Sequence, residues 1–400
     1  MTAAIGSNRL IGLMMGLIVL TPMGVDIFLP SLPVMAQDFA VSSASMRFSI
    51  TLYLVGMGLC QVLAGPLVDW LGRRRMAIAG ALLYTLAAAI CLLTARLEIF
   101  YPARVLQGAG AAIATVVAFS CVRDRFEGER GAGVYSLLNA AVCVVPALAP
   151  LLGSLLATLF HWRATFVFMT LFAAGVAFFC FWRLEETLPR ARRPARPRYG
   201  AADFAVVLAD RHFLFYALIA MTGMAVILIY VTTAPLYLID HSGLDELGFG
   251  AWFGAVAAVN VAAYFAAPWL IKGLGRHVII VLGLGIMVAG GALHALSVLL
   301  HFDGVSAFML TNALMATGFS LTLGAAMSLA LAPHGAHAGV ASSLIGCFQM
   351  AGGALLASLV TLLPMAPQWM LALVGVAGAG GLLIKSLGRG FSGDESRQGR

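Results

Sequence analysis

Residues 304–384 of the chain read GVSAFMLTNALMATGFSLTLGAAMSLALAPHGAHAGVASSLIGCFQMAGGALLASLVTLLPMAPQWMLALVGVAGAGGLLI, 81 residues without a single Asp, Glu, Lys or Arg. A helix that spans a bilayer needs about 20 mostly apolar residues. The stretch is therefore long enough for three such helices, and we expect turns at Pro333-His334-Gly335 and at 364–367, which begins and ends with proline. It predicts a chain built from transmembrane helices.

The rest of the chain has the same character. Of its 400 residues 61% are hydrophobic and only 10% charged, whereas soluble proteins carry about 25% charged residues. Such a chain cannot cover a water-facing surface, which excludes a secreted disulfide scaffold, a disordered protein and an ordinary cytosolic enzyme. All six cysteines fall inside apolar segments without metal-ligand spacing, so we expect no metal site. A polytopic membrane protein remains.

Segments between the charged residues fit twelve transmembrane helices. The N-terminal apolar run is too long for a signal peptide and has no small-x-small cleavage site, so we expect it to be retained. An even number of spans puts both termini on one side of the membrane. The predicted helices run at about 10–32, 46–67, 76–95, 99–122, 133–157, 164–182, 213–238, 248–270, 277–299, 305–331, 339–362 and 367–386.

The positive charges predict the orientation of these helices. On the side of the termini lie 20 of the 24 Lys and Arg residues, against Arg47, Arg96 and Arg163 on the other side and Arg104 inside a helix. Because Lys and Arg accumulate in cytoplasmic loops, both termini are expected in the cytoplasm, with the protein in a bacterial inner membrane. The net charge of +7 then follows from topology, and we expect no binding of nucleic acid.

A basic segment divides the chain into two halves. We predict an N-terminal six-helix bundle over 1–184, a cytoplasmic linker over 185–211, a C-terminal six-helix bundle over 212–387 and a cytoplasmic tail over 388–400. Alternating Arg and Pro near Pro194 and Pro197 favour an extended linker.

The two predicted halves share short sequence matches in the same order, at offsets of 203 to 206 residues. Two parallel repeats with a substrate path between them are typical of a transporter. The matches are Gly72-Arg73-Arg74 with Gly275-Arg276-His277, Leu29-Pro30 with Ala234-Pro235, and Ala132-Gly133-Val134 with Ala338-Gly339-Val340.

Several motifs resemble one transporter family. The loop GPLVDWLGRRR at 65–75 resembles the G-x-x-x-D-x-x-G-R-R signature of the major facilitator superfamily, and RVLQGAG at 104–110 and PALAPLLG at 146–153 are similar to two of its helix motifs. The string DIFLPSLP at 26–33 resembles the Bcr/CflA group of drug:proton antiporters, closest to its MdtL-type multidrug exporters. Two departures are Ala149 before the second motif proline, where antiporters commonly carry Gly, and Ile271 or Lys272 where the repeat of the loop would place an acid.

The resemblance implies an architecture and an activity. The expected fold is all-α, a polytopic membrane protein with two pseudo-symmetric six-helix bundles. The expected activity is proton-coupled efflux by alternating access, with the proton as the coupling ion and no cofactor. Its partners would be small-molecule drugs, protons and the lipid bilayer, and the protein would be a monomer.

Two charged residues lie at membrane depth. Of the 17 acids only Asp26 falls within a predicted span, and Arg104 is its basic counterpart. A charge at the centre of a membrane helix costs about 2.5–3.5 kcal/mol on the insertion scale, so such residues are functional candidates. We expect Asp26 to carry the proton, in competition with drug. The alternatives are a cap at a helix break made by Pro22 and Pro30, or a fixed pair with Arg104.

Arg104 is expected to stay charged, because a guanidinium does not lose its proton in proteins. It would balance charge near Asp26 or donate to a backbone carbonyl of the first helix, with Gln107 one turn away on the same face. A purely structural pair is the alternative to a role in coupling.

The loop signature is expected to form a gate, comprising Gly65, Asp69, Gly72, Arg73, Arg74 and Asp124. Asp69 would accept hydrogen bonds from the start of the helix predicted at 339–362, where the helix dipole favours an acid, and Arg73 would pair with Asp124. The family resemblance implies a latch that closes the cytoplasmic side. The alternative is that the arginines serve topology alone.

The helix motif with Pro146, Pro150 and Gly153 predicts a bend and a close helix approach. We expect a tight interface that limits proton leak, or else a simple kink.

Polar and aromatic side chains near mid-depth are candidates for the drug cavity, although each is more often a helix–helix hydrogen bond. Their apolar surroundings favour neutral or monocationic amphiphiles such as chloramphenicol-like drugs. A specific metabolite exporter, for example of an amino acid, is the alternative; an integral-membrane enzyme or a scaffold ranks lower, because no catalytic cluster is found. The candidates are Tyr53, Gln61, Gln107, Asn139, Tyr230, Tyr237, Asn260, Asn312 and Gln349.

Overall fold

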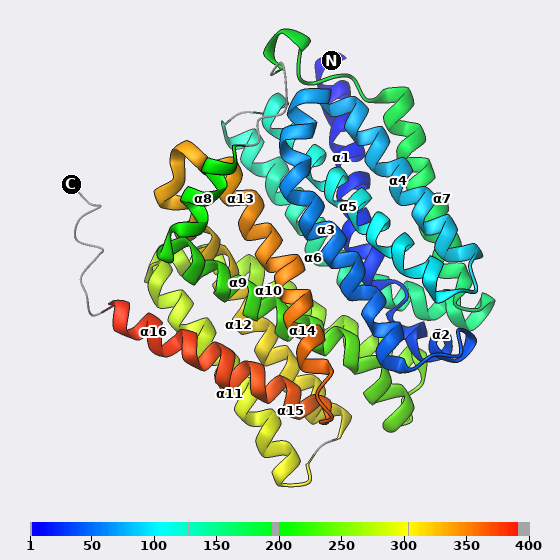
Figure 1. The fold of residues 1–400 in the computed structure, drawn as a ribbon, viewed down its shortest axis with the longest axis vertical. Helices are drawn as coiled ribbons and strands as arrows, with labels where there is room; N and C mark the ends of the chain where they lie inside the picture. Colours follow the sequence, from blue (N-terminus) through cyan, green and yellow to red (C-terminus); the bar gives the residue numbers. More distant parts are fainter. Residues whose placement is uncertain (1, 127, 194–199, 303, 391–400) are drawn as a thin grey trace. The chain divides into compact units, whose positions relative to one another are not determined.

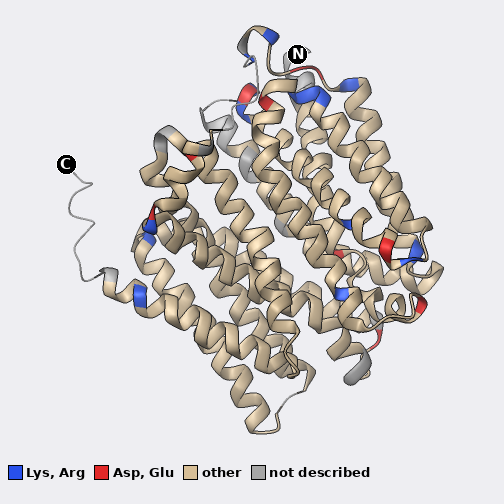
Figure 2. Cartoon of the chain, viewed as in Figure 1, with Lys and Arg blue, Asp and Glu red and all other residues tan. Residues whose placement is uncertain are grey.

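The computed structural model describes residues 2–126, 128–193, 200–302 and 304–390 (Figure 1). Within these ranges every regular element is helical, and twelve helices are long and apolar enough to cross a membrane. Charged side chains gather mainly at helix ends (Figure 2). The predicted all-α polytopic fold with twelve spans is confirmed.

The chain forms two compact units, described separately here. Unit 1 comprises Met1–Phe204 with Leu244–Gly254, and unit 2 comprises Ala205–Gly243 with Ala255–Arg400. The domain boundaries expected from sequence stay a prediction.

In order along the chain the helices are α1 (Thr2–Asp26), α2 (Leu32–Asp38), α3 (Ser43–Leu71), α4 (Arg73–Leu93), α5 (Leu97–Arg125), α6 (Gly128–Phe160), α7 (Arg163–Arg183), α8 (Ala201–Ala209), α9 (Arg211–Pro235), α10 (Glu246–Leu274), α11 (Arg276–Leu299), α12 (Val305–Leu331), α13 (Ala338–Cys347), α14 (Gly353–Thr361), α15 (Pro367–Ala372) and α16 (Gly380–Gly390).

The first span is interrupted beside its acidic residue. Helix α1 ends at Asp26, a 3-10 turn follows at Leu29–Ser31, and α2 completes the span. Pro22 lies inside α1 without ending it, whereas Pro30 sits at the start of the 3-10 turn. The last carbonyls of α1 lack intrahelical partners. The break therefore leaves backbone acceptors free for other groups at the depth of Asp26.

Unit 2 contains both predicted turns and further irregularities. A kinked segment at Ala332–His337 and the gap between α14 and α15 fall where the prolines predicted them, so both turns are confirmed. Three π-helical segments were not predicted, because one extra residue per turn barely alters the hydrophobic pattern. They are Leu236–His241, Phe348–Gly352 and Leu373–Ala379.

The predicted linker is partly folded, which corrects the expectation of an extended segment. Residues Ala201–Ala209 form α8, and Arg190–Arg192 form a 3-10 turn. The sequence AADFAVVLA explains α8, since it is free of Gly and Pro and rich in Ala. Pro194 and Pro197 lie outside the described residues.

Close backbone approach ties α3 to α5 in unit 1. A Cβ at Gly56 would overlap the carbonyl of Val105, and one at Gly108 would overlap the carbonyl of Tyr53. Small residues let membrane helices approach until their backbones touch. These glycines therefore bring the side chains of α3 and α5 near Tyr53 into direct contact.

The start of α9 in unit 2 is anchored by Asp210. Its Oδ1 accepts the backbone N–H of His212 at 2.7 Å, and its Oδ2 lies 3.0 Å from Nε2 of His334 in the kinked segment. Partial burial raises the pKa of Asp210, but these hydrogen bonds outweigh the burial and hold its pKa below the usual value. The carboxylate form is thus stabilised by folding.

We predict that Asp210→Asn lowers the melting temperature of the detergent-solubilised protein near neutral pH. A depressed acid pKa contributes stability above the unfolded value of about 3.9, and this contribution is lost as the pH falls through the folded value. Thermal-shift curves between pH 7 and pH 3 should show the wild type and variant converging below about pH 3.9. A difference of constant size over this range would contradict the assignment.

Candidate functional site

Asp26 lies at the break in the first span, and its side chain is buried with 6% exposure. Across the described part of the chain, no hydrogen bond or ion pair to the Asp26 carboxylate is found. A fixed partner would hold the carboxylate in one charge state. Asp26 is instead a buried acid whose oxygens remain available to a proton or a ligand.

The side chain of Arg104 is completely buried beside the same break. Its NH2 donates to the carbonyl of Gly24 at 2.7 Å, and its NH1 donates to Oε1 of Gln107. The guanidinium carbon lies 4.8 Å from the ring centre of Phe28 and 4.6 Å from that of Tyr53, both within cation–π range. The expected bond to a carbonyl of the first helix is therefore present.

Asp26 and Arg104 do not form an ion pair, although Arg104 binds the backbone two residues before Asp26. Both residues are described, and no ion pair within 4.0 Å joins them. The fixed pair considered from the sequence is absent from this structure. A proton or ligand that binds the Asp26 carboxylate therefore has no bond to Arg104 to displace.

Two further contacts hold the backbone of α1 near the break. The hydroxyl of Tyr53 donates to the carbonyl of Thr21 at 2.9 Å, and the hydroxyls of Thr21 and Thr115 are 2.7 Å apart. A Cβ at Gly24 would lie 2.6 Å from the hydroxyl of Tyr53. Helix α1 is thus fixed to both α3 and α5 immediately before Asp26.

The helix motif of α6 touches this break. Pro146 and Pro150 lie inside α6, which continues through both. A Cβ at Gly153 would overlap the carbonyl oxygen of Ile27, the residue after Asp26. The close approach expected from the sequence is present, and its partner is the turn that carries the buried acid.

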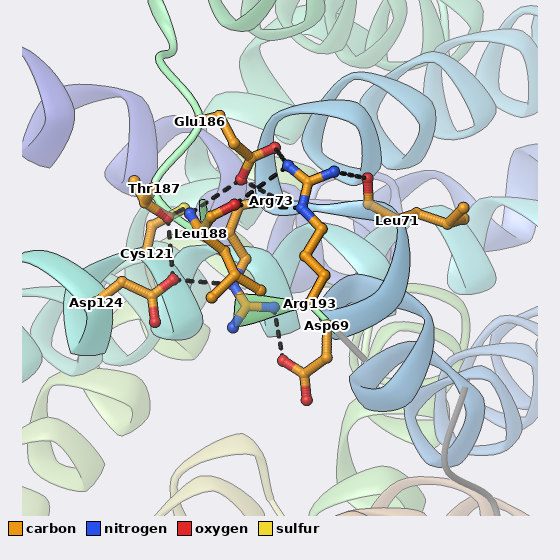
Figure 3. A network of polar contacts seen from close by, with 9 residues as sticks. All are labelled: Asp69, Leu71, Arg73, Cys121, Asp124, Glu186, Thr187, Leu188 and Arg193. Carbon is orange, nitrogen blue, oxygen red and sulfur yellow. Dashed lines mark hydrogen bonds and ion pairs between the residues drawn. The ribbon is translucent and has the colours of Figure 1, made fainter. Parts of the chain in front are cut away.

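A polar network surrounds the loop between α3 and α4 (Figure 3). The buried Arg73 donates from NH1 to Asp69 at 2.6 Å and from Nε to Asp124 at 3.0 Å. Arg74 lies apart from them and donates to the carbonyl of Phe181 at 2.7 Å. Gly72 takes a positive φ of 95°, which favours glycine. The structure thus brings together Asp69, Arg73 and Asp124 as the signature suggested.

Besides Arg74, Gly65 and one expected contact of Asp69 are not part of this network. Gly65 lies in α3, and no atom is within 4 Å of where its Cβ would be. The expected contact of Asp69 with the start of the helix predicted at 339–362 concerns both units, and it stays a prediction.

Sequence reasoning missed three residues of the network, Glu186, Thr187 and Arg193 (Figure 3). Glu186 pairs with Arg193 at 2.8 Å, and Thr187 donates to Asp124 at 3.0 Å. They lie in the predicted linker, where charged residues are ordinarily solvated. The contact of Thr187 with Asp124 joins residues 63 apart in the sequence, so no local sequence pattern predicts it.

The repeat of the loop in unit 2 has similar geometry without the acids. Gly275 also has a positive φ, 85°, and Arg276 donates from NH1 to the hydroxyl of Ser328 at 3.2 Å. Ser328 stands 204 residues after Asp124, at the offset of the repeat. This agreement supports the duplication and places the described ion pairs of the loop in unit 1.

Several cavity candidates are engaged in contacts between helices. Tyr53 and Gln107 belong to the site around Arg104, and Asn260 accepts a hydrogen bond from Ser320. Tyr237 packs on Phe308 with ring centres 4.8 Å apart, and Tyr230 lies 6.4 Å from the same ring. The structure does not gather the other four: Gln61 is partly buried in α3, Asn139 is exposed on α6, Asn312 is buried in α12, and Gln349 is buried in a π-helical segment.

Unit 2 also contains a buried ionisable side chain that is not among the candidates predicted from the sequence. His294 on α11 has no exposed surface, and its Nε2 lies 2.9 Å from the hydroxyl of Thr311 on α12.

We predict that Gly153→Ala abolishes drug export, because the added methyl group must push α6 away from the turn after Asp26. Gly133→Ala is the matched control, since Gly133 lies on the same helix with no atom within 4 Å of its Cβ position. Both variants should be assayed for accumulation of a fluorescent drug at equal membrane expression. Equal export by the two variants would show that the contact with Ile27 is dispensable.

Comparison with known proteins agrees with these features. A family model described as Major Facilitator Superfamily matches residues 14–357. The chain is 34% identical over 340 residues to the multidrug resistance protein MdtL of Citrobacter koseri, covering 85% of each chain. It is 33% identical to the MdtL protein of Escherichia coli strain K12, covering 92% of this chain and 89% of that one.

Solved structures support the same fold. The human organic anion transporter MFSD10 (TETRAN) has a TM-score of 0.67 at 18% identity and covers 95% of this chain and 98% of its own. A D-xylose–proton symporter has a TM-score of 0.74 at 15% identity, with 94% and 97% covered. At these identities the likeness concerns the fold alone. The family match over residues 14–357 and the MdtL relatives at 33–34% identity show that the chain belongs to the major facilitator superfamily.

Proposed function

We propose that this protein is a proton-coupled multidrug efflux antiporter. It exports neutral or monocationic amphiphilic drugs by alternating access, and Asp26 is its proton carrier. The observation that carries the proposal is that Asp26 is the only acidic side chain buried among the described residues. The relatives named multidrug resistance protein MdtL, at 33–34% identity over most of the chain, support the drug specificity.

Coupling follows from competition for one carboxylate. An ionised carboxylate at membrane depth is costly, about 2.5–3.5 kcal/mol on the insertion scale. A proton neutralises Asp26, and a cationic drug neutralises it by pairing, so each ligand weakens the binding of the other. Protons moving inward then drive drug outward. A neutral drug is exported when its binding nearby disfavours the protonated acid.

Arg104 leaves the carboxylate of Asp26 available to a proton or a drug. Its guanidinium is held by Gly24 and Gln107, so it does not occupy the carboxylate of Asp26. The contact of Gly153 with the turn at Ile27 excludes water from the α6 side, which limits proton leak in the absence of drug.

The network around Arg73 serves as a latch in this scheme. Its ion pairs with Asp69 and Asp124 hold the ends of α3, α4 and α5 together in one state of the cycle. The basic residues place this network on the cytoplasmic side, with both termini, in a bacterial inner membrane. The protein acts as a monomer without enzymatic activity or cofactor, and its partners are drugs, protons and lipid.

A drug-susceptibility panel in an efflux-deficient host tests the proposal. We expect expression of the wild type to raise the inhibitory concentration of several amphiphilic drugs. Asp26→Asn should return it to that of the empty vector, because an amide can neither bind nor release the proton. Glu98→Gln is the control, since Glu98 is an exposed acid paired with the exposed Arg96.

Two outcomes would contradict the proposal. No shift with any compound for the wild type would favour the alternative, an exporter of a specific metabolite such as an amino acid. Full resistance conferred by Asp26→Asn at equal expression would remove Asp26 as the proton carrier.

A further inference from the structure

We infer that Glu186, Thr187 and Arg193 are positioning residues that clamp the loop between α3 and α4 from the linker, and we call residues 186–193 the strap. This inference deepens the proposed function, because the loop carries the ion pairs assigned there to the latch. Figure 3 shows the strap folded over the loop, with side chains from both directed at each other.

Glu186 caps a helix that cannot cap itself. Helix α4 begins at Arg73, and its N-cap residue is Gly72, which has no side chain. Glu186 Oε1 accepts the backbone N–H of Arg73 at 2.9 Å. Helix N-termini leave their first N–H groups unsatisfied, and a nearby negative charge is favoured by the helix dipole. The cap that is usually supplied by a residue of the same turn comes here from 113 residues further along the chain.

Arg193 caps the C-terminal end of α3. Its NH1 donates to the carbonyl of Leu71, the last residue of that helix, at 3.1 Å. A cation is favoured at this end of a helix dipole. Arg193 also pairs with Glu186 at 2.8 Å and donates to the carbonyl of Leu188. One ion pair in the strap thus satisfies both helix ends that flank Gly72.

The glycine of the loop is required by this arrangement. Gly72 has a φ of 95°, and a Cβ there would lie 2.5 Å from NH2 of Arg193 and overlap the carboxylate of Glu186. The strap therefore occupies the space that any side chain at position 72 would need. Sequence signatures assign this Gly to the loop alone, whereas its neighbours in space come from the linker.

Thr187 connects the strap to the ion pairs themselves. Its hydroxyl donates to Oδ2 of Asp124 at 3.0 Å, and the same oxygen accepts Nε of Arg73 at 3.0 Å. Arg73 can reach Asp69 and Asp124 together only while the start of α4 stays in place. The strap holds the start of α4 through the cap made by Glu186 and through the hydrogen bond of Thr187 to Asp124.

The chain connects the strap to unit 2. Helix α8 follows further along the chain, and unit 2 begins within that helix, at Ala205. The strap therefore holds the start of α4 from the segment that leads along the chain to unit 2.

Glu186→Ala tests this with three readouts on the purified full-length protein in proteoliposomes. We expect the maximal rate of proton-driven drug export to fall about fivefold, because the latched state then loses the equilibrium factor by which a lost helix cap typically destabilises a helix. The drug dissociation constant and drug-induced proton release should stay at wild-type values, because Asp26 and Arg104 are untouched. Glu185→Ala is the control, since Glu185 is 87% exposed and pairs only with Arg125 at 3.7 Å.

The charge-swapped variant with Glu186→Arg and Arg193→Glu separates capping from a simple ion pair. It keeps opposite charges at the two positions but sets each against the wrong helix dipole, so we expect no rescue of the export rate. Rescue by the swap, or an unchanged rate in Glu186→Ala, would overturn the inference. A wild-type protein without drug-induced proton release would instead refute the proposed function and is distinguished by that readout.

Discussion

The burial of the Arg104 guanidinium is the constraint around which the first unit is organised. A permanent charge at membrane depth is unfavourable, and the unit offsets it with the carbonyl of Gly24, the amide of Gln107 and the faces of Phe28 and Tyr53. These partners come from α1, its terminal turn, α3 and α5. None of these partners is a carboxylate, and among the described residues Asp26, two positions after Gly24, has no bond to Arg104.

The two repeats differ in how they hold their loops. In unit 1, Arg73 pairs with Asp69 and Asp124, whereas Arg276 in unit 2 binds the hydroxyl of Ser328. An ion pair depends on charge and a hydroxyl contact does not, so the unit 1 loop is the one suited to a latch. The buried Asp26 and Arg104 lie in unit 1 as well. The residues to which we assign proton coupling and gating thus lie in the same half of the molecule, within the residues described.

The sequence predicted those features that depend on composition and on local turn residues such as proline. Charge scarcity located twelve spans and singled out Asp26 and Arg104, since apolar helices leave few places for charge. Features that rest on distant contacts could not be predicted. In the sequence, Glu186 is an ordinary charged residue of the linker, and only the fold brings it to Arg73. The sequence also does not show that Arg104 donates to the carbonyl of Gly24 instead of pairing with Asp26. The π-helical segments add one residue to a turn, which the hydrophobic pattern does not register.

Drug-induced proton release from the detergent-solubilised protein tests the central claim most directly. In weakly buffered solution, adding a transported cationic drug to the wild type should release protons, because the drug displaces the proton from Asp26. Asp26→Asn should release none while still folding to a monodisperse protein. Unchanged proton release from Asp26→Asn would contradict the account and place the coupling on another group, of which the buried His294 is the first to examine.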